Sequence, residues 1–399
     1  MSPKRETFHD RHRGMSYQED EETYNEDDDN FNSQYHKRYY DNEVRCCSGP
    51  KVVLFFVTLG ITFGVVFGLV DLDTINNAIG SGTNNNNESS SEDSYTFMQC
   101  PKNGECCNGL ESNCDLRVNE IMWATVHNAN HDDVFIPNNE APLEQALEAG
   151  YRGLFLDVCL CNDETGNLNL QFCHTMCNIG KRDPIEVFTN IRTFLTSNPS
   201  EVIFINFEIS SGKPSPALIW NTVVKAGLKE MSYIHTKNNF PTMRSLVKNG
   251  RQLILSKHNG KDCTDPTIKG CKRRIVEYFN YVAETDYAFN NVEAIEDSMN
   301  SCLVTRGLEG TKQFYAINNF VTSSILGPSK SSADIVNEQS FLEKRIKDCQ
   351  SVTGMEANII AVDFWQRGDL PKVVQETNIA RAIKRRSLLQ RARRWLRSW

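Results

Sequence analysis

The sequence predicts an α/β fold of the TIM-barrel type over residues 100–378, preceded by a single transmembrane helix and a disordered N-terminus. Three observations support this prediction. Short apolar runs alternate with amphipathic stretches between residues 115 and 378, as in a parallel sheet covered on both faces. About 260 residues with seven or eight such units suit a (β/α) barrel. Residues 52–70 are long and apolar enough to cross a bilayer.

The N-terminal tail and the apolar segment define the predicted topology. Residues 1–50 are acidic and poor in aliphatic side chains, which predicts a disordered cytosolic tail. The 19 uncharged residues 52–70, inside a predicted transmembrane helix over 51–71, would span roughly 28 Å. Basic residues precede this segment and acidic residues follow it, so the positive-inside rule predicts a single-pass type II membrane protein. A buried core helix is the alternative interpretation of this segment.

A low-complexity stalk is predicted over residues 72–99, because this stretch is rich in Asn and Ser and could not form a packed core. It contains one glycosylation sequon, at Asn87. The folded ectodomain would therefore be luminal or extracellular.

Cysteine usage agrees with that placement. Cys46 and Cys47 lie on the cytosolic side and are either palmitoylation sites or unmodified thiols. The other twelve cysteines lie beyond the apolar segment, and an even number in an oxidising compartment predicts up to six disulfides. A zinc site in the group Cys159, Cys161, Cys173 and Cys177 is the alternative. Bridges that join Cys159 and Cys161 to Cys173 and Cys177 would hold the neighbouring Asp157 and His174 in place. The pairing itself cannot be deduced from the sequence.

The predicted strands are seven apolar runs, over 121–129, 153–160, 168–174, 201–209, 252–258, 313–321 and 358–365. Residues 141–150 end on a glycine suited to a helix C-terminus. Residues 183–199 open with Asp-Pro, as an N-cap and a first turn do. An open doubly wound sheet is the main alternative, but no glycine-rich phosphate loop follows the first run.

The net charge of −8 is unevenly distributed. Residues 1–50 carry a net of −5 and residues 381–399 a net of +8, which leaves −11 on the body of the chain. An acidic body argues against nucleic acid as the main partner. The basic segment 379–399 has apolar residues at helical spacing, so it is either an interfacial helix that grips an anionic bilayer or a disordered tail that docks on the acidic body. As an interfacial helix, it would keep the catalytic mouth near lipid.

Polar side chains recur at the ends of the predicted strands, where a barrel gathers its catalytic groups. These residues are His127, Asn128, Asp157, His174, Glu208, Lys257, His258 and Asp363. Each alone has a structural explanation, but their repetition at one end predicts a functional site. His131, in the loop after the first run, has no predicted role.

The order of these motifs resembles the X-domain of phosphatidylinositol-specific phospholipase C. The resemblance rests on His127-Asn128-Ala129, GYRGLFLDV (150–158), Cys173-His174, NPSEVIFINFE (198–208) and NIIAVDFWQRGDLPKVVQETN (358–378). Glycerophosphodiesterases share the barrel, but they are expected to open with His-Arg and to carry a Glu-x-Asp pair, which are absent here.

This resemblance implies phosphodiester cleavage by general acid–base catalysis. His127 would accept the proton of the attacking hydroxyl, and His174 would protonate the leaving alkoxide. Asp363 is the candidate for orienting His127, as carboxylates do in other histidine-based sites.

The calcium-dependent branch of the family holds its metal with Asn and acidic residues. Asn128, Asp157 and Glu208 match three of these positions, and such oxygen ligands suit Ca²⁺. The family's further Glu is replaced by Phe155, so the calcium site would be incomplete. Lys257 could supply charge to the phosphate, or it could be a strand-end lysine with no role.

The sequence thus predicts a phospholipase C-like phosphodiesterase whose partners are a phospholipid or other phosphodiester substrate and a membrane. A non-inositol headgroup is an alternative substrate. A catalytically silent barrel that serves as a binding ectodomain is the alternative function. The sequence predicts no oligomeric state.

Overall fold

A computed structural model describes residue 100 and residues 105–397, except 133, 135, 175, 211, 237–238, 261–262, 264–269 and 324–326. The predicted acidic tail, transmembrane helix 51–71, stalk with its sequon, and Cys46 and Cys47 lie outside the described residues. Among the helices that the structure does describe, none combines the length and the apolar character that a bilayer crossing requires. Residues Glu92–Trp399 form one compact unit, which contains every described element.

The strands are β1 (Trp123–Val126), β2 (Gly153–Asn162), β3 (Leu168–His174), β4 (Met176–Arg182), β5 (Ile203–Ile209), β6 (Leu253–His258), β7 (Ile275–Glu277), β8 (Val282–Thr285), β9 (Val304–Arg306), β10 (Phe314–Asn318), β11 (Thr322–Ser323), β12 (Gly327–Pro328) and β13 (Ile359–Val362). The helices are η2 (Glu111–Asp115), α4 (Leu143–Glu148), α5 (Pro184–Ser197), α6 (Pro216–Lys225), α7 (Met243–Lys248), η3 (Tyr278–Asn280), α8 (Val292–Glu296), α9 (Ser298–Ser301), α10 (Lys330–Val336), α11 (Gln339–Thr353) and α12 (Leu370–Arg397).

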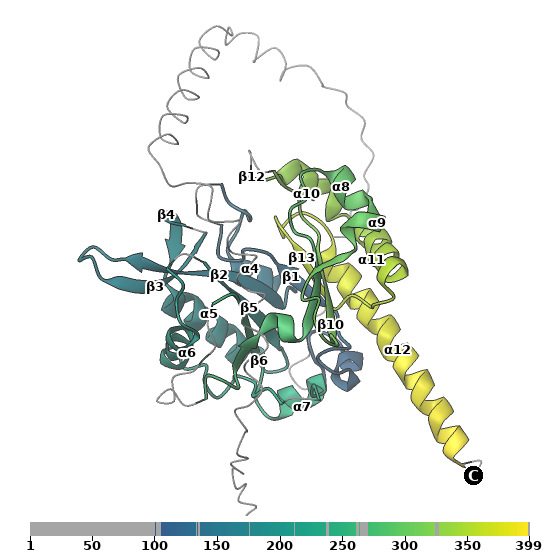
Figure 1. Cartoon of the computed structure of the whole chain (residues 1–399). Coiled ribbons are helices and arrows are strands. Elements are labelled where there is room, and N and C mark those ends of the chain that lie inside the picture. The colour runs from purple at the N-terminus through teal and green to yellow at the C-terminus, as the bar shows by residue number, and fades with distance from the viewer. Residues whose placement is uncertain are drawn as a thin grey trace, which may run out of the picture. The chain divides into compact units, whose positions relative to one another are not determined.

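One curled sheet forms the centre of the fold (Figure 1), with the strand order β7-β6-β5-β2-β1-β13-β10-β8-β9. From β7 to β8 all neighbouring strands are parallel, and they follow one another in chain order with β13 beside β1. This is the order of a TIM-type barrel. The predicted mixed α/β fold is therefore present.

The sheet is not closed by hydrogen bonds within the described residues, which corrects the prediction of a complete barrel. The physical reason is β9, a short strand that pairs antiparallel with β8 on the edge away from β10. It occupies the edge that β7 would need in order to close the ring.

Two helix predictions are confirmed. Helix α4 lies inside the predicted 141–150 and stops just before Gly150, whose φ is 101°. Helix α5 starts at Pro184, and the side chain of Asp183 caps it by accepting a hydrogen bond from the amide of Ile185.

The run 168–174 is not a barrel strand. It forms β3, which pairs antiparallel with β2 and then with β4. Figure 1 shows this β2–β3–β4 ribbon extending from the sheet. The apolar residues of β3 pack against α5, so a strand of the ribbon looks like a barrel strand in the sequence.

The cysteines beyond the apolar segment form six disulfides, as predicted: Cys100–Cys106, Cys107–Cys114, Cys159–Cys173, Cys161–Cys177, Cys263–Cys271 and Cys302–Cys349. Two of them cross-link β2 to the chain around His174. The thiolates that a zinc site would need are therefore already used in disulfides.

Alternation along the strands separates two cores. On β1 and β2, Val126, Leu154 and Leu156 face the helices, in a core shared with α5 and α6. Trp123 and Phe155 belong to the second core, inside the curl of the sheet. Because side chains alternate with a period of two, His127, four residues after Trp123, and Asp157, two residues after Phe155, also face the interior. The carboxyl ends of the strands therefore project His127 and Asp157 into the open end of the curled sheet, here called the mouth.

Candidate active site

His127 and Asp363 come together at the mouth although they are 236 residues apart. His127 follows β1 and Asp363 follows β13, and these two strands are parallel neighbours. The Nδ1 atom of His127 lies 2.8 Å from Oδ1 of Asp363. Because a carboxylate accepts hydrogen bonds, the Nδ1 atom carries the proton, and Nε2 is left with a lone pair. The ring of Phe320 stacks on His127 with the centroids 4.0 Å apart and nearly parallel planes.

His174 reaches the same region by a different route. Strand β3 runs back along β2, so its last residue returns toward the level of Asp157 at the mouth. The disulfide Cys159–Cys173 ties the adjacent residue to β2. Burial lowers the pKa of the half-buried His174, and the nearby His127 lowers it further, while Asp363 and Glu208 act in the opposite direction. His174 is therefore a stronger acid when protonated than an exposed histidine is.

His131 was given no role from the sequence, and the structure places it beside His174. Its side chain is fully buried, and the two rings lie with their centroids 4.1 Å apart. Its Nε2 donates to the carbonyl of Cys173, and its Nδ1 lies 3.2 Å from Oδ1 of Asn138. Burial and the neighbouring His174 lower the pKa of His131 to about 3, so this ring is neutral at physiological pH.

Asn138 links the two histidine environments. Its Nδ2 donates to Oδ1 of Asp363 at 3.0 Å, and its Oδ1 accepts from Nδ2 of Asn128 at 3.2 Å. The same oxygen faces His131. A continuous set of polar contacts therefore runs from the partner of His127 to the neighbour of His174.

A second polar group projects from β5 and β6. Ser256 donates to Oδ1 of Asn206 at 2.9 Å, and Nδ2 of Asn206 donates to Nδ1 of His258 at 2.8 Å. This fixes the His258 proton on Nε2, which lies 3.3 Å from Oε1 of Glu208. Burial alone would raise the pKa of Glu208, but His258 and His127 hold it below its usual range. Glu208 is therefore charged.

Arg306 and Glu284 form a further ion pair inside the curl, at 2.7 Å. Glu284 is buried on β8, and burial raises its pKa while Arg306 opposes that effect. Arg306 also interacts electrostatically with Glu208. The sequence did not point to this pair, because β8 and β9 are only four and three residues long.

Lys257 is not brought together with this group. It alternates with Ser256 and His258, so it lies on the opposite face of β6. Its side chain is 1% exposed, and Nζ forms an ion pair with Glu277 of β7. The neighbouring His258, rather than the predicted Lys257, lies on the interior face of β6 beside Glu208.

The predicted calcium ligands are each engaged with protein groups. Glu208 pairs with His258, the amide of Asn128 donates to Asn138, and Asp157 lies 4.0 Å from Nε2 of His131. Among the described residues, no group of three or more His, Cys, Asp or Glu side chains is arranged to hold a metal ion. In this arrangement the three side chains do not fit a metal ion. Whether they rearrange around Ca²⁺ stays a prediction.

Phe155 occupies the position of the missing Glu. It lies in the interior core, 5% exposed, with its ring edge-on to Tyr278 at a centroid distance of 5.9 Å. An aromatic side chain thus fills the space in which the family pattern has a carboxylate.

Comparison with known proteins gives one family. The family model described as PI-PLC X 1 matches residues 113–378. No curated protein matches the chain.

Solved structures with similar folds include two phosphatidylinositol-specific phospholipases C. A mutant of the Staphylococcus aureus protein has 14% identity and a TM-score of 0.47, covering 66% of this chain and 95% of its own. The Listeria monocytogenes protein has 14% identity and a TM-score of 0.43, covering 67% and 95%. A calcium-dependent phosphoinositol-specific phospholipase C from a Pseudomonas species has 12% identity and a TM-score of 0.35, covering 64% and 92%.

Proposed function

The chain belongs to the family of phosphatidylinositol-specific phospholipase C X domains, and we propose on this basis that it is a phosphodiesterase that cleaves a phosphoinositide-like lipid. The observation that carries the proposal is the 2.8 Å contact between His127 and Asp363, close to a second histidine of lowered pKa. Two histidines with different surroundings can divide the acid and base roles between them.

His127 is the proposed general base. Asp363 holds the proton on Nδ1, so Nε2 faces the reaction with its lone pair. The inositol 2-hydroxyl oxygen attacks phosphorus and forms a new P–O bond, while its proton moves to Nε2 of His127. Phe320 and Asp363 hold the imidazole in one plane, which reduces the orientational entropy lost during the reaction.

His174 is the proposed general acid. The bond between phosphorus and the lipid oxygen breaks, and the leaving alkoxide takes the proton of His174. The lowered pKa of His174 makes proton donation easier, although a smaller fraction of the enzyme is protonated at neutral pH. A cyclic phosphodiester and a diacylglycerol are the products of this step.

Positive charge near the mouth comes from Arg306, and His258 adds a hydrogen-bond donor. Negative charge develops on the phosphoryl oxygens in the transition state, and fixed cations in a shielded site stabilise it. The Nε2–H group of His258 and the guanidinium of Arg306 are already oriented by Asn206 and Glu284.

Hydrolysis by the full-length chain in mixed micelles tests the proposal. Phosphatidylinositol and other phosphodiester lipids are presented with and without calcium, and cyclic or monophosphate headgroups are measured. His127→Ala and His174→Ala are each expected to lower kcat by at least about 100-fold. His235→Gln is the matched control, because His235 is a buried histidine outside this cluster.

The outcomes separate the alternatives. Cleavage of a different lipid would support the proposed acid and base roles, but it would replace the proposed inositol headgroup with another one. No turnover of any lipid by a folded chain would overturn the enzyme proposal and leave a binding ectodomain.

A further inference from the structure

Helix α12 has two halves with different surroundings. In the first half, Leu370, Val373 and Ala382 are buried against the body. Asn378 donates to the carbonyl of Met122 and accepts from its amide, which fixes the helix beside the start of β1. Beyond about residue 386 the side chains are almost all exposed, and Figure 1 shows this part extending from the body. Residues 386–397 are called the arm.

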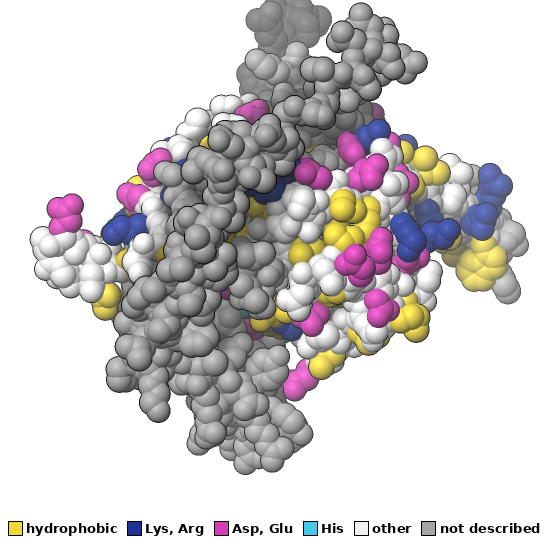
Figure 2. Space-filling view, turned by 90° about the horizontal axis from the view of Figure 1, so that it is seen from above, with side chains coloured by type: hydrophobic (Ala, Val, Ile, Leu, Met, Phe, Trp, Pro, Cys, Tyr) yellow, Lys and Arg dark blue, Asp and Glu magenta, His cyan; other side chains and the backbone are white. Residues whose placement is uncertain are grey.

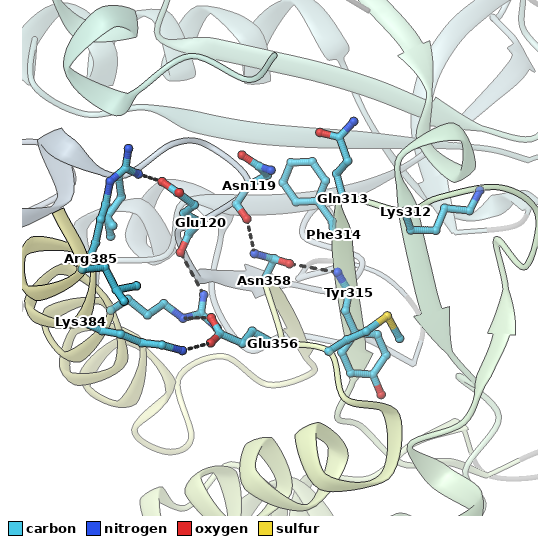
Figure 3. A pocket seen from close by; sticks show the side chains of 14 residues that line it. Asn119, Glu120, Lys312, Gln313, Phe314, Tyr315, Glu356, Asn358, Lys384 and Arg385 are labelled. Atoms are coloured by element: carbon cyan, nitrogen blue, oxygen red, sulfur yellow. Dashed lines mark hydrogen bonds and ion pairs between the residues drawn. The ribbon is translucent and has the colours of Figure 1, made fainter. Parts of the chain in front are cut away.

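The arm leaves the body at the amino ends of the strands. Arg381 donates to the carbonyls of Glu120 and Ala357, which precede β1 and β13. Lys384 pairs with Glu356 at 2.7 Å. Figure 3 shows the pair of Lys384 and Glu356 beside a cavity of about 360 Å³, which lies between α12, the start of β10 and the residues that precede β13.

The mouth is at the other end of the same strands, because His127 and Asp363 follow β1 and β13. This corrects the expectation that the basic tail would hold the catalytic mouth near lipid. The helix after β13 runs back along the sheet, so its end is on the side opposite to the site.

The arm is amphipathic. Leu388, Leu389 and Leu396 are 54%, 49% and 66% exposed, and together with Ala392 they fall within one side of the helix. This side continues the inward face of the first half, to which Arg381 and Arg385 belong. It is apolar although the body no longer covers it. Trp395, also exposed, lies on the same side.

The other side of the arm is basic. Arg386, Arg391, Arg393 and Arg394 lie there, and the arm contains no acidic residue. Figure 2 shows dark blue and yellow side chains together at the right-hand end, where α12 extends from the body. Within the described part of the chain, Arg391, Arg393 and Arg394 form no ion pair.

We propose that the arm binds an anionic lipid bilayer, so that the amino ends of the strands face this bilayer and the mouth opens away from it. An apolar stripe with tryptophan, bordered by arginines, has the composition of an interfacial helix. Pairing with the arm of a second copy would bring ten arginines together without any acid, which like-charge repulsion opposes. If the chain is the proposed lipid phosphodiesterase, its substrate reaches the mouth from another surface or from micelles.

Vesicle binding tests the arm independently of catalysis. Residues 92–399 contain the complete sheet and both cores, so this unit is expected to fold without the preceding residues. It is incubated with phosphatidylcholine vesicles with and without phosphatidylserine, at low and high salt, and the bound fraction is measured by sedimentation. We expect binding to the phosphatidylserine vesicles only, weakening with salt.

Two arm variants and two control variants test whether the arm itself causes the vesicle binding. Each arginine near an anionic surface contributes roughly a fivefold change in affinity, so Arg391→Gln, Arg393→Gln and Arg394→Gln together should weaken binding roughly 100-fold. Leu389→Glu with Leu396→Glu should abolish it. The controls change equivalent groups elsewhere: Lys225, Lys229 and Lys248 to Gln, and the exposed Leu308 to Glu.

Two results would overturn the proposal. One is equal binding by the arm variants and the controls. The other is no vesicle binding, with light scattering showing a dimer that the arm variants convert to a monomer. Because lipid hydrolysis is not measured, a failure here is distinct from a failure of the proposed function.

Discussion

The imidazole of His131 packs against the imidazole of His174, with 4.1 Å between their centroids. His131 donates to the carbonyl of Cys173, the residue before His174, so it holds both the backbone and the ring of the proposed general acid. It is a positioning residue, because its own pKa of about 3 keeps the ring neutral at neutral pH, so it has no second proton to give to a leaving group.

Replacing His131 tests this positioning role. His131→Leu removes one of the two hydrogen bonds that the Cys173 carbonyl accepts, the other being donated by Asn130, which should destabilise the fold by about 1 kcal/mol. We expect kcat to fall while KM changes little, and His131→Gln, which can still donate to the carbonyl, should restore part of kcat. Kinetics and thermal melts of both variants provide the measurement. Equal loss in the two variants at equal stability would argue for another role.

Asp363→Asn tests the proposed base. The substitution keeps the shape and can accept the hydrogen bond from Asn138, but an amide does not hold the His127 proton on Nδ1 as a carboxylate does. We expect kcat to fall about 100-fold or more with little change in the free energy of unfolding. Asp334→Asn is the control, because this exposed carboxylate pairs with Arg367 and not with a histidine. Unchanged turnover in Asp363→Asn would remove Asp363 from the mechanism.

The pH dependence of kcat/KM reports on His174. A general acid must be protonated, so activity is present below its pKa and is lost as the pH rises through that value. Burial and His127 lower the pKa of His174 from 6.5. The alkaline limb of the profile should therefore lie below pH 6.5, and Glu208→Gln, which removes a charge that raises this pKa, should move the limb lower still. An alkaline limb above pH 6.5 would be inconsistent with His174 as the acid.

Calcium binding is tested at Phe155. If Asn128, Asp157 and Glu208 hold Ca²⁺, a fourth oxygen ligand should strengthen the site. Without calcium, Phe155→Glu should lower the melting temperature, because it places a carboxylate beside Tyr278 in the apolar interior. Added calcium should raise the melting temperature of this variant more than that of the wild type. Asp157→Asn should remove the calcium-dependent rise in both proteins. Calorimetric titration showing no binding by either protein would reject the calcium prediction.

The clustering of residues that follow parallel strands was enough to predict that His127 and Asp363 lie close together. Both follow apolar runs, and parallel neighbours place such residues at one end of a sheet. The interior face of β6 was harder to predict. Lys257 was the candidate for supplying charge to the phosphate, but a shift of one residue reverses whether Lys257 or His258 faces the interior. A signal was present: Asn206-x-Glu208 and Ser256-x-His258 alternate in phase with the apolar residues before them.

Other features depend on distant pairings that the sequence does not encode locally. The three residues of β9 are too short to show a pattern, yet their pairing with β8 keeps the sheet open and brings Arg306 to Glu284. His131 was missed because a buried histidine after a strand has no distinguishing spacing. Its partners, Asn138 and Cys173, lie seven and 42 residues away.

The two disulfides of the β2–β3–β4 ribbon would make the proposed catalytic activity depend on redox state. Cys159–Cys173 and Cys161–Cys177 close loops of 14 and 16 residues around the segment that returns His174 to the mouth. Under reducing conditions both constraints are removed, and the proposed acid is held only by its β-sheet hydrogen bonds and by His131. The proposed activity of a newly made chain would therefore develop only after these two disulfides have formed.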